Sequence, residues 1–96
     1  MAHTFEELVA KHRAADAAHE KVLELRDTYG PPALQQPGGA QSETYETALR
    51  AWRDLARDEL TAVSEYARDE GRPRSEVEAE VERVAARPEE IGRAHV

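Results

Sequence analysis

Two histidines and two acidic residues of this 96-residue chain have the types and spacing suited to holding a metal ion. They are His12, Asp16, His19 and Glu59. Asp16 and His19 have a carboxylate-x-x-histidine spacing, which places both side chains on one side of a helix. Carboxylates and imidazoles that project inward from facing helices are how helical bundles hold iron, manganese or zinc. The sequence therefore contains a candidate metal site at these four residues.

The same four residues also suit a purely structural role. Bundle metal sites use glutamate at the first position of the motif and repeat the motif on a second helix, whereas residues 43–70 contain no histidine. Polar groups inside an apolar seam more often fix helix register or oligomeric state. We therefore favour pairing of these groups with one another or with a tyrosine (Tyr29, Tyr45 or Tyr66). A histidine beside a carboxylate would also make association depend on pH.

No other motif indicates catalysis or nucleotide binding. The chain has no cysteine, which excludes a thiol nucleophile, a disulfide framework and a thiolate zinc site. Gly38 and Gly39 lie in a proline-rich segment and lack the spacing of a phosphate-binding loop. With 20 acidic residues in the chain, neighbouring carboxylates are expected on solvated surfaces and do not indicate acid–base catalysis. The sequence favours a protein that is not an enzyme and has no cofactor.

The charge balance limits the possible partners. The net charge is −7 and no region is basic, which argues against nucleic acid and favours a basic protein partner. The turn at residues 71–74 followed by a helix resembles a helix-turn-helix motif, but the glutamates of residues 76–87 would face phosphate. No apolar run is long enough for a membrane span or a secretory signal, so we expect a cytoplasmic protein. Arginine outnumbers lysine 11 to 2, which is typical of a GC-rich bacterial genome.

Three predicted helices position these residues. Thr4 and Glu7 form a capping box that begins a helix over residues 5–29, which Gly30 and two prolines end. Residues 30–42 are rich in proline and glycine and are expected to connect this helix to the next one.

The second helix is expected over residues 43–70, capped by Ser42 and ended by Gly71 and Pro73. A second capping box, Ser75 with Glu78, predicts a short third helix over residues 76–87. Residues 1–87 would then form one helical domain, and residues 88–96 a C-terminal tail.

Helical periodicity gives the two long helices apolar stripes of unequal quality. Placing residues at 100° per step gathers a strong stripe on the second helix: Tyr45, Leu49, Trp52, Leu55, Ala56, Leu60, Val63, Tyr66 and Ala67. The first helix has a thinner stripe that includes Leu8 and Val22 and is interrupted by His12, His19 and Arg26. The residues expected to form the core or an interface are Trp52, Tyr45, Leu49, Val63, Leu8 and Val22.

An antiparallel pairing of the two long helices would bring opposed residues to the same level. Trp52 then faces the alanine-rich residues 14–18, and its truncation should cost about 3–5 kcal/mol. Glu59 comes within a turn of His12, and Arg26 faces Glu46 as an ion pair.

The predicted fold is all-α, a long antiparallel helical hairpin with a short third helix. Only 21 residues are large and apolar, so a monomer would have a small core, and we expect two hairpins to dimerise into a four-helix bundle. The leading functional hypothesis is a small acidic, non-enzymatic interaction or regulatory protein that acts as a homo-oligomer with a further, unknown protein partner. The alternatives are a bundle that binds iron, manganese or zinc, and an inhibitor or anti-defence protein whose acidic surface occupies a basic groove.

Overall fold

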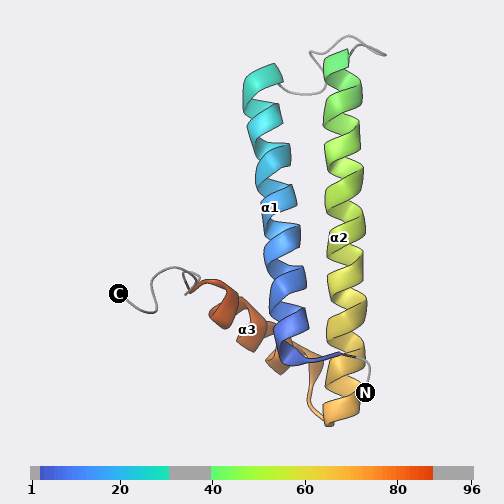
Figure 1. The fold of residues 1–96 in the computed structure, drawn as a ribbon, viewed down its shortest axis with the longest axis vertical. Helices are drawn as coiled ribbons and strands as arrows, with labels where there is room; N and C mark the ends of the chain where they lie inside the picture. Colours follow the sequence, from blue (N-terminus) through green and yellow to red (C-terminus); the bar gives the residue numbers. More distant parts are fainter. Residues whose placement is uncertain (1–2, 31–39, 88–96) are drawn as a thin grey trace.

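The computed structural model describes residues 3–30 and 40–87. These residues form three helices, α1 (Phe5–Tyr29), α2 (Ala40–Glu70) and α3 (Arg74–Ala85), and no strand occurs among them (Figure 1). The predicted all-helical class is therefore confirmed. Most of the predicted connector, residues 31–39, and the predicted tail, residues 88–96, lie outside the described residues.

Local signals set both ends of α1, which has the predicted bounds. The Glu7 amide donates to the Thr4 hydroxyl at 3.1 Å, and the Thr4 amide donates to the Glu7 carboxylate at 2.9 Å. This reciprocal pair satisfies two of the amides that a helix N-terminus leaves open. At the other end Gly30 has a φ of 85°, and its amide donates to the Arg26 carbonyl at 2.8 Å.

The start of α2 differs from the prediction, whereas its end agrees with it. The helix begins at Ala40, so Ser42 lies inside the first turn and is not its cap. Gly71, with a φ of 66°, ends the helix in a Schellman motif. The Gly71 amide donates to the Arg68 carbonyl at 3.2 Å, and the Arg72 amide donates to the Ala67 carbonyl at 2.9 Å.

The predicted capping box of α3 is wrong. The helix begins at Arg74 after Pro73, which makes no side-chain capping bond, and Ser75 lies within the first turn. The cause is the tight turn after α2. It presents the Pro73 carbonyl to the amides of Glu76 and Val77, at 3.1 and 3.2 Å, and so starts the helix early.

The two long helices lie side by side and run in opposite directions, and α3 crosses them near one end (Figure 1). The N-terminal end of α1 meets the C-terminal part of α2, where His3 and Glu65 are 2.7 Å apart. Further along, His12 contacts Glu59 and His19 stacks on Trp52. Among the described residues, no helix has the length and apolar character that spanning a bilayer requires.

The core lies at the end of the helical pair that α3 covers. Its buried members come from all three helices: Leu8, Ala62, Val63, Ala67, Val77 and Val81, with Phe5 and Tyr66 packed against them. Of the six residues expected in the core or interface, Leu8, Val22 and Val63 are buried. The other three, Tyr45, Leu49 and Trp52, are only half-buried because they lie on α2 beyond the part that packs with α3.

Candidate functional site

His12 joins two carboxylates at the junction of the three helices. Its Nδ1 lies 2.7 Å from Oε2 of Glu59 on α2, and its Nε2 lies 3.4 Å from Oδ2 of Asp16, one turn further along α1. Each ring nitrogen therefore lies beside a carboxylate oxygen. The side chains of His12 and Glu59 are 18% and 20% exposed.

A groove of about 250 Å³ opens beside this contact between all three helices. Its lining combines the pair with apolar residues of α2 and glutamates of α3: His12, Ala56, Glu59, Leu60, Val63, Glu78 and Glu82. Glu78 also pairs with Arg74 at 3.2 Å. The groove thus has an apolar floor and an acidic rim, which suits a positively charged group with an apolar stem.

His19 does not join this cluster. Its ring stacks on Trp52, with centroids 4.4 Å apart and planes at 21°. His12 and His19 are separated by seven residues, or about 10 Å along the helix, so the indole of Trp52 and not the His12 cluster lies beside His19. Among the described residues, no three His, Cys, Asp or Glu side chains are arranged to hold a metal ion. The structure brings His12, Asp16 and Glu59 together and leaves His19 apart.

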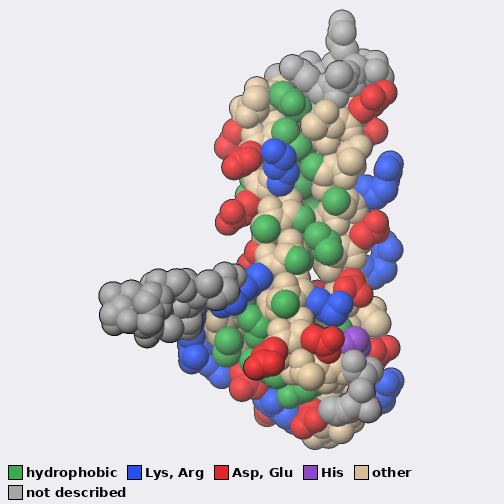
Figure 2. All heavy atoms as spheres, viewed as in Figure 1, with side chains coloured by type: hydrophobic (Ala, Val, Ile, Leu, Met, Phe, Trp, Pro, Cys, Tyr) green, Lys and Arg blue, Asp and Glu red, His purple; other side chains and the backbone are tan. Residues whose placement is uncertain are grey.

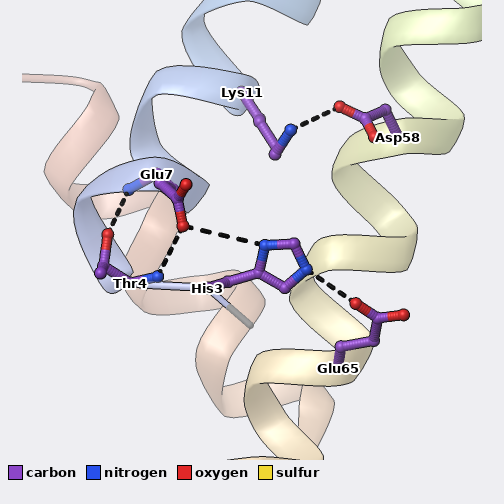
Figure 3. A network of polar contacts seen from close by, with 6 residues as sticks. All are labelled: His3, Thr4, Glu7, Lys11, Asp58 and Glu65. Atoms are coloured by element: carbon purple, nitrogen blue, oxygen red, sulfur yellow. Dashed lines mark hydrogen bonds and ion pairs between the residues drawn. The ribbon is translucent and has the colours of Figure 1, made fainter. Parts of the chain in front are cut away.

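A second polar cluster, which no sequence pattern predicts, lies at the end of the helical pair (Figure 3). His3 bridges Glu65 of α2 at 2.7 Å and Glu7 of the capping box at 3.8 Å. Nearby, Lys11 pairs with Asp58 at 2.6 Å. This hydrogen bond to Asp58 raises the pKa of Lys11. These contacts join the N-terminal end of α1 to α2.

Arginines attach α3 to the rest of the chain. The guanidinium of Arg13 on α1 donates to the last carbonyls of α3, those of Val84 and Ala85, and to that of Arg87, at 3.2–3.4 Å. Cationic donors at a helix C-terminus satisfy open carbonyls and complement the helix dipole. At the other end Arg72 pairs with Glu80 at 2.9 Å, and this hydrogen bond raises the pKa of Arg72.

An apolar surface continues along the helical pair beyond α3. We call it the open stripe; its members are His19 and Leu23 of α1 with Tyr45, Leu49, Trp52, Ala56 and Leu60 of α2. Leu23 is 41% and Leu60 47% exposed, and the others are half-buried. Arg26 is exposed within the α1 part of this face. The predicted ion pair of Arg26 with Glu46 is absent among the described contacts, because Glu46 points outward from the helical pair.

The other side of the helical pair carries a second groove, of about 450 Å³, lined by Lys21, Leu25, Glu43, Thr44, Thr47, Ala48 and Ala51. Figure 2 shows a line of apolar side chains between the two long helices, with charged side chains along both outer edges. The two large aliphatic side chains that are exposed among the described residues, Leu23 and Leu60, both belong to the open stripe.

Comparison with protein-family models, with curated proteins and with solved structures gives no match to this chain.

Proposed function

We propose that this chain is a non-enzymatic interaction or regulatory protein that acts as a homodimer, in which two α1–α2 pairs form a four-helix bundle. The observation that carries the proposal is the open stripe. α3 covers only the end that contains Val63, and the stripe continues from there with Leu60 and Leu23 nearly half exposed. Monomeric proteins rarely leave a contiguous apolar surface of this kind uncovered.

The composition of the stripe supports an interface. Burying an exposed large aliphatic side chain contributes about 1.5–3 kcal/mol, so covering the exposed halves of Leu23 and Leu60 contributes on the order of 1 kcal/mol each. Tyr45 and Trp52 belong to the residue types that dominate interface energetics. The remaining face of α3, whose exposed residues include Glu76 and Glu82, stays available for a basic partner.

Light scattering coupled to size-exclusion chromatography tests the assembly. We expect twice the chain mass of 10.7 kDa. Leu23→Lys together with Leu60→Lys should yield monomers, because both charges would be buried in the interface. The matched control is Thr61→Lys, an exposed position two and a half turns from Trp52 on the opposite side of α2. A cooperatively melting wild-type monomer would refute the proposal.

Metal binding at His12, Asp16, His19 and Glu59 is the second candidate function, favoured by the contact of His12 with Glu59. Iron, manganese or zinc here would require Asp16 to leave the other ring nitrogen of His12 and His19 to turn away from Trp52. Elemental analysis of the purified protein decides the question. The idea is refuted if no stoichiometric metal is present and if added iron, manganese or zinc leaves the melting temperature unchanged.

An inhibitor or anti-defence protein is the third candidate, favoured by the acidic rim of the groove at Glu59, Glu78 and Glu82. Such a protein would insert this surface into a basic groove of its target. A pull-down should then recover a partner whose binding weakens steeply with salt. Recovery that does not depend on salt would contradict this candidate.

A further inference from the structure

The outer edge of α2 carries charges in an order that is complementary to itself. Along the helix the exposed residues Glu43 and Glu46 are followed by Arg50, Arg53 and Arg57. Within the described residues Arg57 pairs with Asp54 at 3.5 Å, and Arg50 and Arg53 form no ion pair. Like charges spaced three or four residues apart repel each other on one helix. A second copy of this edge running in the opposite direction would set arginine against glutamate.

The geometry points to an antiparallel dimer, in which a two-fold axis perpendicular to the helices places the open stripe of one copy on that of the other. This inference rests on the proposed homodimer and specifies its arrangement. In it, Glu46 lies opposite Arg53 of the second copy. The two Glu46–Arg53 contacts lie on either side of an axis that passes beside Arg50.

The stacking of His19 on Trp52 shows which levels of the two long helices coincide. It places position 21 of α1 level with position 50 of α2, so the same axis passes α1 near position 21.

The apolar residues of the stripe agree with this axis. It sets Leu49 against Trp52 of the second copy, and Tyr45 against Ala56. On α1 it sets Leu23 against His19 of the second copy. Large side chains thus meet small or flat ones, as interdigitating layers require.

The position of α3 excludes the alternative two-fold, parallel to the helices, at this face. Leu60 and Val63 lie on the side of α2 that α3 covers. A parallel two-fold would bring both copies of α3 together between the helical pairs and hold the stripes apart. With the antiparallel two-fold, one α3 lies beyond each end of the region where the two helical pairs overlap. Only the parts of the pairs that α3 leaves uncovered are then in contact.

Charge reversal tests the pairing. Arg53→Glu, and separately Glu46→Arg, should each weaken homodimerisation about tenfold, because two contacts change from attractive to repulsive. Mixing the two variants should restore a dimer, and so should one chain with both substitutions. All these positions are exposed, and circular dichroism verifies that each variant stays helical. Undiminished dimerisation of both reversed variants would overturn the pairing.

Spin labels test the direction. The chain contains no cysteine, so Arg50→Cys or Asp69→Cys provides a single labelling position. In the antiparallel dimer the two labels at position 50 lie close together. The labels at position 69 lie about 57 Å further apart along the helix axis, at 1.5 Å per residue. Short distances at both positions would overturn the arrangement and leave the homodimer standing, whereas a monomeric wild type would overturn both.

Discussion

The imidazole of His19 stacks on the indole of Trp52, with ring centroids 4.4 Å apart and planes inclined by 21°. This contact takes His19 out of the polar cluster at His12 and joins α1 to α2 at the middle of the open stripe. The alanines beside His19 give the indole room, so the ring covers the seam without being fully buried. The contact therefore belongs to an apolar surface and not to a metal site.

Truncation of Trp52 should accordingly cost less than it would in a closed core. We expect Trp52→Ala to lower the free energy of unfolding of the monomer by about 2 kcal/mol, below the 3–5 kcal/mol typical of a fully buried tryptophan. The loss is measured by urea titration of Trp52→Ala in the monomeric background that carries Leu23→Lys and Leu60→Lys. Trp52→Phe, which keeps an aromatic face for His19, should lose less than about 1 kcal/mol. A loss above 4 kcal/mol for Trp52→Ala would mean that the indole is buried.

Leu8 should be far more sensitive than Leu49, although both are leucines on an apolar stripe. Leu8 has no exposed surface and packs with α3, so Leu8→Ala should cost about 3 kcal/mol by leaving a cavity. Leu49 is half-buried beyond α3, and Leu49→Ala should cost about 1 kcal/mol in the monomer. Equal losses in urea titrations of the two variants would contradict a core confined to the α3 end.

Removal of the Arg13 guanidinium should increase local opening of α3, with only a small decrease in the free energy of unfolding of the whole chain. Its hydrogen bonds end on backbone carbonyls of the last turn of α3, so Arg13→Ala should speed amide exchange in α3 and cost about 1 kcal/mol. Arg13→Lys should rescue little, because an ammonium lacks the planar fork that reaches several carbonyls. Hydrogen exchange by mass spectrometry separates the two effects. Unchanged exchange in residues 77–85 would show that Arg13 does not secure α3.

The Lys11–Asp58 pair should contribute about 0.5 kcal/mol at low salt, because both side chains are partly solvated. The raised pKa of Lys11 means that this contribution is present at neutral pH and is lost as the pH rises through that pKa, in the strongly alkaline range. A double-mutant cycle of Lys11→Met and Asp58→Asn at pH 7 and at about pH 12 measures the coupling. Coupling that persists undiminished at the higher pH would contradict the assignment.

The sequence predicted what local signals determine. Thr4, Glu7 and Gly30 set both ends of α1 through their neighbours in the chain, so α1 has its predicted bounds. The start of α3 depends on how the Gly71 turn presents the Pro73 carbonyl, which a search for capping boxes does not detect. Periodicity identified the stripe of α2 but could not say that α3 would cover Val63 and leave Leu49 open.

Some of the polar contacts could be predicted from the sequence and others could not. Counting along two antiparallel helices brings His12 and Glu59 to one level, where the structure shows them 2.7 Å apart. The same counting leaves His19 free to face either Asp16 or Trp52, and the structure shows it stacked on Trp52. Arg13 gave no signal, because its partners are backbone carbonyls more than 70 residues later in the chain.

Gly71 offers a test of backbone strain that no packing change obscures. Its φ of 66° favours glycine, and a Cβ built there meets no atom within 4 Å. Gly71→Ala should therefore cost about 1 kcal/mol, entirely from the left-handed backbone that the Schellman motif requires. Gly71→Asn should cost less, because asparagine tolerates this conformation better than alanine. Thermal melts of the two variants give the comparison. Equal losses of stability for Gly71→Ala and Gly71→Asn would contradict the assignment of the cost to the positive φ.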